Sequence, residues 1–365
     1  MPKIVYDYQV FCWQRYGGIS RYIYELANRL SEKEDYDVKV LAMAYVNEYL
    51  KKSKPGLVIG FPVPKIRKTG TIIRTFNIYT SKAWLYSNPP DIVHETFFNL
   101  KQVAPKKSKV VVTVYDMLQE KFPEFFPEYK TPQERAETVK RADHVICISE
   151  NTKKDLLELV NIDPHKVSVV HLAPSFNPVY EEESEKVVPE PYILYVGDRP
   201  NYKNFHRLLQ AYASSPKLSQ HFKLVCFGGK PFSAQELETF AALEIPEGWV
   251  IHTSGNDSVL AKYYRGASIF VYPSLYEGFG IPPLEAMSLG CPVACSNTSS
   301  MPEVAGNAAE YFDPYDLDSI AEALEAVLYS LERSRKLISL GLERVNHFSW
   351  KLCAEKTAQV YSSLL

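Results

Sequence analysis

The sequence predicts an α/β protein made of two domains, each organised around a parallel sheet. The chain has 365 residues, which is more than one hydrophobic core normally serves. Short apolar runs alternate with longer stretches of helical period along most of its length, a rhythm typical of β/α layers. The rhythm stops over residues 173–191, where four prolines and an acidic run indicate a linker.

The first domain is predicted over residues 1–175. Its short apolar runs are bounded by polar residues or proline and are interpreted as buried strands, over residues 4–8, 38–44, 57–61, 92–94, 110–114, 144–148 and 167–171. A helical period over residues 19–30 follows the first strand. Together these segments predict one sheet with helical crossovers.

The second domain is predicted over residues 176–349, because the same rhythm restarts after the linker. Further strands are expected over residues 192–196, 223–227, 249–252, 269–272, 292–294 and 310–312. A last helix, over residues 350–365, is expected to cross back to the first domain. Two such domains are expected to bind a ligand between them, near the carboxyl ends of both sheets.

The composition excludes several classes of protein. Hydrophobic residues make up 46% of the chain and its formal net charge is −2, which disfavours both disorder and general nucleic-acid binding. None of the six cysteines stands in a C-x-x-C pair, which indicates a reducing cytoplasm and no metal site. We find no secretory leader and no apolar stretch of about 20 residues, so we expect a soluble protein, peripheral to a membrane at most.

One stretch of the first domain, residues 49–90, is basic and rich in aromatic residues. It contains eight Lys and Arg residues and no Asp or Glu. Such a surface can attract anionic lipid head groups or a phosphate-linked acceptor. A solvated helix face above core aromatics explains the pattern equally well, so both interpretations stay open.

The strongest chemical signal is the segment 274–287, which follows a predicted strand and opens a helix at one of two consecutive prolines. Gly278 and Gly280 permit a tight turn whose amides can approach a ligand, and the helix start adds partial positive charge. These features predict an anion site suited to a diphosphate. Glu277 and Glu285 flank the turn and can bind hydroxyl groups, which points to a nucleotide sugar.

The spacing of Glu277 and Glu285 resembles the E-x7-E motif of retaining glycosyltransferase family 4, and residues 290–306 resemble the next segment of that family. The resemblance implies a GT-B fold, in which two Rossmann-like domains face each other across a cleft. It implies that Glu277 binds the donor sugar, that Glu285 holds the ribose diol and that main-chain amides reach the sugar or diphosphate. The donor-binding residues implied on this motif are Glu277, Gly278, Phe279, Gly280, Ile281 and Glu285.

Two cations extend the resemblance. Arg199 and Lys203 follow the first strand of the second domain, where the family places an Arg and a Lys against the diphosphate. Lys203 fits this pattern well, whereas Tyr202 stands where the family more often has its Arg. Cations at this place offset the charge that develops on the leaving group. The implied catalytic residues are therefore Glu277, Lys203 and Arg199.

Residues of the first domain are expected to face the donor and the acceptor. Gly17 and Gly18 resemble the Gly-Gly loop of the family, whose amides approach the donor phosphate or sugar. His94 and Asp116 follow predicted strands, where reactive side chains collect, and are the candidates for the acceptor side. An interior histidine and a capping aspartate are the alternatives for these two residues. The family often has a histidine before this aspartate, but this chain has Tyr115.

Several other catalytic signatures are absent from the sequence. We find no G-x-x-x-x-G-K-[ST] and no G-x-G-x-x-G after the first strand, so kinase and dehydrogenase functions are disfavoured. The motifs G-x-S-x-G and H-E-x-x-H are also missing. Asp316 and Asp318 form a D-x-D pair, the form used by metal-dependent glycosyltransferases, but their place at a helix start predicts a cap.

These observations predict a retaining, metal-independent hexosyltransferase that uses no cofactor. It is expected to move a sugar from a nucleoside-diphosphate sugar to a glycan or polyprenyl-diphosphate-linked acceptor, in bacterial exopolysaccharide or cell-surface glycan assembly. UDP-sugars are favoured over GDP-mannose as donors, although no residue decides between them. Two alternatives stay open: a nucleotide-sugar epimerase of the same fold, and a non-catalytic nucleotide-sugar binding module.

Overall fold

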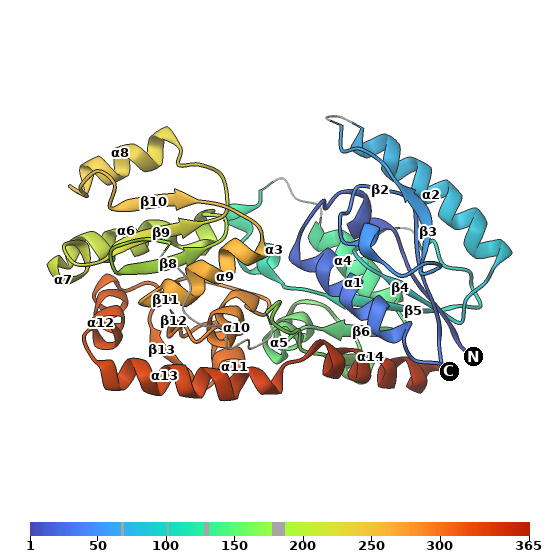
Figure 1. Cartoon of the computed structure of the whole chain (residues 1–365). Helices are drawn as coiled ribbons and strands as arrows, with labels where there is room; N and C mark the ends of the chain where they lie inside the picture. The colour runs from blue at the N-terminus through green and yellow to red at the C-terminus, as the bar shows by residue number, and fades with distance from the viewer. Residues whose placement is uncertain (67–68, 101, 128–130, 177–186) are drawn as a thin grey trace. The chain divides into compact units, whose positions relative to one another are not determined.

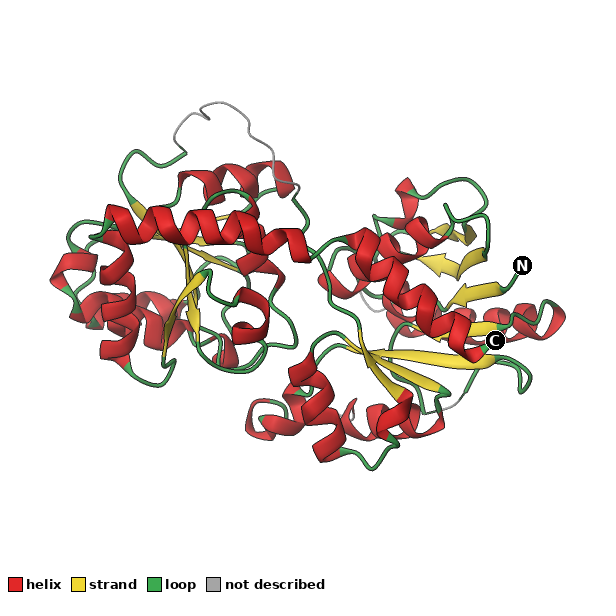
Figure 2. Cartoon of the chain, turned by 90° about the horizontal axis from the view of Figure 1, so that it is seen from below, coloured by secondary structure: helices red, strands yellow, loops and turns green. Residues whose placement is uncertain are grey.

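The computed structural model describes residues 1–66, 69–100, 102–127, 131–176 and 187–365. Within them the chain forms two compact parts: unit 1 contains residues 1–172 and 350–365, and unit 2 contains residues 173–349. Each unit holds one sheet with helices on both faces (Figure 1, Figure 2). Both units are Rossmann-like, which confirms the predicted fold class. Residues 177–186 of the predicted linker lie outside the described residues.

The sheet of unit 1 has seven parallel strands in the order β3-β2-β1-β4-β5-β6-β7. These strands are β1 Lys3–Tyr6, β2 Asp37–Tyr45, β3 Val58–Pro62, β4 Ile92–Glu95, β5 Lys109–Val114, β6 His144–Cys147 and β7 Val167–Val169. The α-helices are α1 Gly18–Leu30, α2 Gly70–Ser87, α3 Leu118–Lys121, α4 Thr131–Arg141, α5 Glu150–Leu159 and α14 Trp350–Leu364. Short 3₁₀ helices follow as η1 Gln9–Cys12, η2 Leu50–Lys52, η3 Pro123–Phe125 and η4 Pro164–Lys166.

The predicted strands of unit 1 are all present, because parallel strands covered on both faces appear in sequence as continuous apolar runs. Strand β1 is shorter than predicted and ends at Tyr6. The reason is Asp7, whose carboxylate accepts hydrogen bonds from the Thr96 amide at 2.9 Å and the Gln9 side chain at 2.8 Å. These bonds turn the chain out of the sheet.

The sheet of unit 2 has six parallel strands in the order β10-β9-β8-β11-β12-β13. These strands are β8 Tyr192–Val196, β9 Lys223–Phe227, β10 Val250–Thr253, β11 Ile269–Tyr272, β12 Val293–Ser296 and β13 Ala309–Phe312. The helices of eight or more residues are α6 Phe205–Ser214, α8 Ala234–Ala242, α9 Asp257–Gly266, α10 Ile281–Ser288, α12 Leu317–Leu328 and α13 Leu331–Arg344. The shorter helices are α7 Pro216–Ser219, α11 Met301–Ala305, η5 Asn201–Lys203 and η6 Val345–His347.

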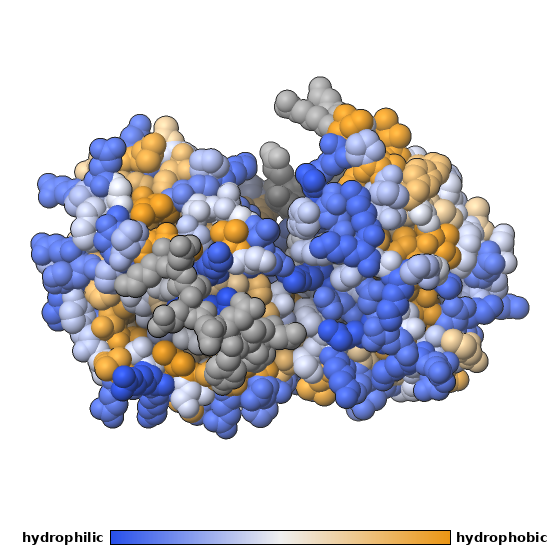
Figure 3. Space-filling view, in the orientation of Figure 1, coloured by the Kyte–Doolittle hydropathy of each residue, from blue (hydrophilic) through white to orange (hydrophobic). Residues whose placement is uncertain are grey.

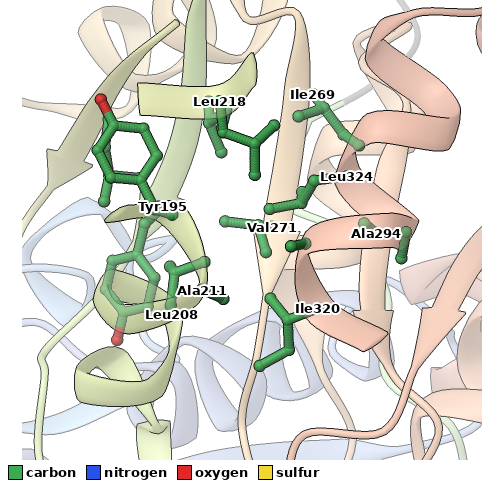
Figure 4. Packing of buried hydrophobic residues seen from close by; sticks show 14 of the residues in the cluster. Tyr195, Leu208, Ala211, Leu218, Ile269, Val271, Ala294, Ile320 and Leu324 are labelled. Atoms are coloured by element: carbon green, nitrogen blue, oxygen red, sulfur yellow. The ribbon is translucent and has the colours of Figure 1, made fainter. Parts of the chain in front are cut away.

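The core of unit 2 is a cluster of buried apolar side chains between the sheet and helices α6 and α12 (Figure 4). Val271 of β11 and Ala294 of β12 meet Leu208 of α6 and Ile320 of α12 in this cluster. Burial of such side chains contributes about 1.5–3 kcal/mol each. The cluster therefore fixes the strands whose carboxyl ends carry the candidate site.

The last helix, α14, belongs to unit 1 although the chain passes through unit 2 before reaching it. It packs against α1, and its Trp350 and Tyr361 side chains are buried. The Tyr361 hydroxyl lies 2.8 Å from the Tyr6 hydroxyl and 2.6 Å from Nδ1 of His94. Helix α14 is thus bonded to both β1 and β4 of the sheet.

Strand order reverses beside the first strand of each sheet. In unit 1 the chain moves from β1 toward β2 and β3 and later returns to place β4 on the other side of β1. In unit 2 the strands β9 and β11 flank β8 in the same way. The loops that follow such neighbouring strands diverge, and open α/β sheets bind ligands in the crevice left at their carboxyl ends. Functional residues are therefore expected after β1 and β4 and after β8 and β11.

Candidate functional site

A lysine and a glutamate meet at the strand-order reversal of unit 2. Lys203 follows β8, Glu277 follows β11, and Nζ of Lys203 lies 2.6 Å from Oε1 of Glu277. The side chains are 18% and 13% exposed, so the pair is reachable from solvent but largely shielded by protein. Nζ of Lys203 also donates to the hydroxyl of buried Tyr272, at 3.3 Å. The structure therefore brings together two of the three predicted catalytic residues.

The loop after β12 holds the glutamate loop in place. Ser299 Oγ accepts a hydrogen bond from the Glu277 amide at 3.0 Å. Ser300 Oγ donates to the carbonyl oxygens of Glu277 and Phe279, at 2.9 and 2.8 Å. These contacts fix the backbone on both sides of Gly278, while the ion pair with Lys203 holds the Glu277 carboxylate.

Gly280 is required by its backbone conformation. Its φ of +101° lies in the left-handed region, and a Cβ at this position would lie 2.3 Å from Cε of Met301. The following residue, Ile281, is the first of α10, which begins one residue before the prolines at which the sequence predicted it. Phe279 is buried and its ring packs against Phe348, so only its backbone can face a ligand.

Lys203 is aimed by the end of η5. The next residue, Asn204, adopts a left-handed conformation with φ of +58°, and its side-chain amide donates to the Pro314 carbonyl at 2.7 Å. The carbonyl of Tyr202 accepts a hydrogen bond from the Leu275 amide at 2.8 Å. The lysine loop and the glutamate loop are therefore joined through the backbone as well as through the ion pair.

Glu285 lies on α10 and is buried. One of its oxygens, Oε2, accepts a hydrogen bond from the Tyr264 hydroxyl at 3.4 Å. Burial, followed by the nearby Glu285 carboxylate, raises the pKa of Tyr264 well above its usual value, so this phenol remains a neutral donor. The contact holds the Glu285 side chain against α9, and its predicted contact with a ribose stays a prediction.

Arg199 differs from its expected position in the cluster. Its Nε lies 2.6 Å from Oε1 of Glu236, its Nη2 donates to the Lys230 carbonyl at 2.7 Å, and its guanidinium stacks 4.8 Å from the ring of Phe232. Glu236 itself closes the N-terminal capping box of α8. The guanidinium is thus neutralised by Glu236 of α8 and enclosed by the loop after β9, segments that sequence spacing did not connect to it, whereas Lys203 pairs with Glu277.

The predicted Gly-Gly loop of unit 1 starts a helix. Gly17 precedes α1 in extended conformation and Gly18 is its first residue. A Cβ on Gly17 would lie 2.6 Å from the side-chain oxygen of Gln14, which accepts a hydrogen bond from the Ser20 amide at 3.0 Å. Gly17 therefore leaves room for the glutamine that caps α1, and the contact of either glycine with a donor stays a prediction.

The acceptor assignment of His94 is corrected by the structure. The ring is fully buried, with Nδ1 bonded to the Tyr361 hydroxyl at 2.6 Å and Nε2 to the Thr113 hydroxyl at 2.8 Å. Burial lowers the pKa of His94 to about 3, which keeps the ring neutral. With both nitrogens occupied inside the core, His94 joins β4, β5 and α14 and does not reach an acceptor.

Asp116 and Asp316 both act as local caps. Oδ1 of Asp116 accepts a hydrogen bond from the Leu118 amide at 3.0 Å at the start of α3, although the half-exposed carboxylate still faces solvent. Oδ1 of Asp316 accepts from the amides of Asp318 and Ser319 at the start of α12, as the sequence predicted for this D-x-D pair. An acceptor contact of Asp116 stays a prediction.

Comparison with known families decides the class of the protein. Residues 177–344 match the model of "Glycosyl transferases group 1", and residues 16–174 match the model of "Glycosyltransferase Family 4". The two matched segments lie almost end to end and together cover most of the chain. The protein belongs to the group 1 glycosyltransferases.

Relatives of this glycosyltransferase include enzymes of bacterial surface polysaccharides. The chain is 28% identical to the O-antigen chain mannosyltransferase B of Escherichia coli, over 95% of this chain and 96% of that protein. It is 31% identical to the O-antigen chain mannosyltransferase RfbU of Salmonella typhimurium, over 52% of each chain. These similarities support a role in glycan assembly.

Solved structures of other proteins share the fold. A sucrose-phosphate synthase from Thermosynechococcus elongatus superposes with a TM-score of 0.79 at 20% identity, covering 100% of this chain and 99% of that one. Anabaena Alr3699/HepE in complex with UDP-glucose superposes with a TM-score of 0.77 at 15% identity, covering 100% of both chains. At these identities the likeness concerns the GT-B fold alone.

Sequence reasoning missed the residues that support the glycosyltransferase site. Tyr272, Ser299 and Ser300 hold the Lys203–Glu277 pair and its loop, yet the sequence assigned a role to none of them. The available signal was their place at the carboxyl ends of β11 and β12.

Among the described residues, no helix is both long and apolar enough to cross a bilayer.

Proposed function

We propose that this glycosyltransferase retains the anomeric configuration of the sugar that it moves from a nucleoside diphosphate to an acceptor hydroxyl. The Lys203–Glu277 pair at the strand-order reversal of unit 2 carries the proposal. The pair lies beside the left-handed turn at Gly280 and the start of α10, where backbone dipoles favour a diphosphate. Cation, carboxylate and helix start thus match the phosphates and hydroxyls of one activated sugar.

The proposed mechanism assigns different tasks to the two charged groups. The ammonium of Lys203 offsets the negative charge that develops on the diphosphate as the glycosidic bond breaks. The carboxylate of Glu277 accepts hydrogen bonds from sugar hydroxyls and orients the ring. The acceptor oxygen attacks the face from which the diphosphate departs, and a phosphate oxygen takes its proton. We therefore assign no side-chain base, and we expect transfer to continue in the presence of EDTA.

A thermal-shift series tests donor binding. UDP-glucose, UDP-galactose and GDP-mannose are each added to the full chain, and the melting temperature is followed. A ligand that binds only the folded state at about 100 times its Kd adds about 2.7 kcal/mol of stability. The sequence favours UDP-sugars, whereas the names of the relatives favour a mannosyl donor, so the compound with the largest shift decides between these predictions. A series without any shift contradicts the proposed function.

Incubation with the binding donor separates the remaining alternatives. A transferase releases diphosphate only when acceptor is present, apart from slow hydrolysis. An epimerase converts the donor alone into an isomeric sugar, and a binding module does neither. Chromatography of donor and nucleotide, with and without a lipid-linked glycan extract, distinguishes the three outcomes.

We further propose a polyprenyl-diphosphate-linked glycan as acceptor, at the cytoplasmic face of a bacterial membrane, for surface polysaccharide assembly. The six cysteines are all unpaired and buried, which fits a reducing compartment. The surface of unit 1 supports a membrane contact, because Ile72, Phe76, Tyr79 and Tyr86 are exposed at helical spacing along α2. Apolar surface gathers over this helix at the upper right of Figure 3.

Charge on the same face selects anionic lipid. Nζ of Lys82 lies 5.9 Å from the ring of Tyr86, so a cation accompanies the exposed apolar residues of α2. A Lys or Arg near an anionic membrane contributes about 1 kcal/mol, and apolar side chains that insert add to it.

Vesicle co-sedimentation tests the membrane contact. The full chain is expected to sediment with phosphatidylcholine vesicles that contain phosphatidylglycerol and not with pure phosphatidylcholine vesicles. The double variant Ile72→Ser with Tyr79→Ser is expected to bind about tenfold more weakly, because it loses two inserting side chains. The control Leu159→Ser changes an exposed apolar residue on α5, away from α2. Sedimentation that is indifferent to lipid charge, or equal loss in the control, contradicts the contact.

A further inference from the structure

A small aromatic pocket lies at the strand-order reversal of unit 1. It has a volume of about 130 Å³ and is lined by residues that include Tyr8, Trp13, Arg74, Phe97, Phe98 and Glu134. The first two follow β1 and the two phenylalanines follow β4, so the pocket occupies the crevice between the diverging loops of these strands. It is the counterpart in unit 1 of the place that the Lys203–Glu277 pair occupies in unit 2.

The walls of this pocket are formed largely by aromatic side chains. Trp13 is 44% exposed, and its indole meets the ring of Phe97 edge to face at 5.6 Å. Phe97 in turn packs on Phe98, with ring centroids 4.8 Å apart. The guanidinium of Arg135 lies 4.9 Å from the centroid of the Phe98 ring. The packing of Phe97 against the indole fixes the orientation of Trp13, while much of the indole surface stays exposed to solvent.

Two opposite charges line the pocket beside these rings. Arg74 reaches it from α2 and Glu134 from α4. Within the described ranges, neither side chain has a hydrogen bond or an ion pair to protein. Arg74 can donate hydrogen bonds to a ligand and Glu134 can accept them, so the two together suit neutral hydroxyl groups better than a charged ligand of either sign.

The floor of the pocket is rigid. The Asp7 carboxylate binds the Thr96 amide and hydroxyl and the Gln9 side chain, and the Gln9 amide nitrogen donates to the Phe97 carbonyl at 2.7 Å. This buried network joins the loop after β1 to the loop after β4. The network fixes the backbone at Phe97, whose ring contacts Trp13, so the pocket needs little ordering when a ligand enters.

We infer that this pocket binds the acceptor, and that it takes one pyranose ring of the glycan by stacking the ring on Trp13. An apolar cavity of about 150 Å³ binds benzene, so a pocket of about 130 Å³ has room for one face of a six-membered ring whose hydroxyl groups extend beyond it. A pyranose offers an apolar face of C–H groups to an aromatic wall and hydroxyl groups to Arg74 and Glu134. The inference rests on the proposed transferase function and adds the substrate class recognised by unit 1.

Binding of simple glycosides to the full chain tests the inference. Methyl glycosides of mannose, glucose, galactose and N-acetylglucosamine serve as probes, and saturation-transfer NMR detects contact with the sugar C–H groups. At least one probe is expected to bind wild-type protein. Trp13→Ala is expected to weaken that binding at least about tenfold, the equivalent of 1.4 kcal/mol. Arg74→Gln is expected to weaken it less, and Leu159→Ala, an exposed apolar change elsewhere in unit 1, leaves it unchanged.

Kinetics separate this inference from the proposed function. In Trp13→Ala the KM for acceptor is expected to rise about tenfold while the KM for donor stays the same. If wild type transfers sugar and Trp13→Ala retains the acceptor KM, the pocket assignment is overturned and the transferase function stands. Failure of all four methyl glycosides to bind wild type overturns it as well. If no nucleotide sugar shifts the melting temperature of wild type, the proposed function fails first.

Discussion

Glu277→Gln is expected to lower kcat by about two to three orders of magnitude, the range seen when one preorganised polar contact to a transition state is removed. The amide has the shape of the carboxylate but carries no charge, so it loses the 2.6 Å ion pair with Lys203 and holds the sugar hydroxyls less firmly. Nucleotide binding is expected to persist, since the turn at Gly280 and helix α10 do not depend on the Glu277 side chain. Steady-state kinetics with the donor identified by thermal shift, together with that shift itself, measures both effects.

The matched control is Glu236→Gln. It makes the same chemical change in the same unit and breaks an ion pair with the other predicted cation, Arg199. Because Arg199 is enclosed by the loop after β9, we expect this variant to keep wild-type kcat within a factor of about three, at some cost in stability. Equal losses of kcat in the two variants would restore Arg199 to the catalytic site. Unchanged turnover in Glu277→Gln would remove Glu277 from it.

Deletion of residues 350–365 is expected to unfold unit 1. Helix α14 buries Trp350, Val360 and Tyr361 against the rest of the unit, and each large apolar side chain contributes about 1.5–3 kcal/mol. The deletion also leaves Nδ1 of His94 and the Tyr6 hydroxyl without their partner, at about 1–3 kcal/mol for each buried group. The sum reaches the total stability of about 5–15 kcal/mol that is usual for a folded domain.

Tryptophan fluorescence during urea unfolding measures the loss of stability in unit 1. Of the four tryptophans of the chain, Trp13 and Trp84 remain in the truncated unit 1, and Trp249 reports on unit 2. The milder variant Tyr361→Phe removes one hydroxyl, and we expect it to fold with about 1–3 kcal/mol less stability. A truncated chain that unfolds in urea at the midpoint of the wild type would contradict the role given to α14.

Much of the fold could be predicted because parallel strands covered on both faces appear in the sequence as continuous apolar runs. Strands β8, β9 and β11 begin and end where their apolar runs do, since helices cover both of their faces. The end of β1 could not be predicted, because it depends on hydrogen bonds that Asp7 accepts from Thr96, a residue 89 positions away. Local pattern carries no information about such a partner.

The candidate site likewise contains residues that the sequence located correctly and residues whose surroundings it could not predict. Lys203 and Glu277 lie in segments that resemble family motifs and that contain the left-handed residues Asn204 and Gly280, so the sequence identified them. His94 and Arg199 also follow the pattern of strand ends, but their surroundings come from distant segments. The partner of His94 lies 267 residues later on α14, and the partner of Arg199 lies on α8. Sequence places a side chain at a strand end, but long-range packing decides whether it faces solvent.

The return of α14 to unit 1 bears on how the chain is made. Unit 2 is inserted between the sheet of unit 1 and the helix that completes its packing. Domains fold largely in the order of synthesis. Unit 2 can therefore complete its folding on the ribosome while unit 1 still lacks helix α14. During that interval the apolar face of α1 stays open to water. A newly made chain therefore exposes apolar surface of unit 1 to aggregation until residues 350–365 have been made.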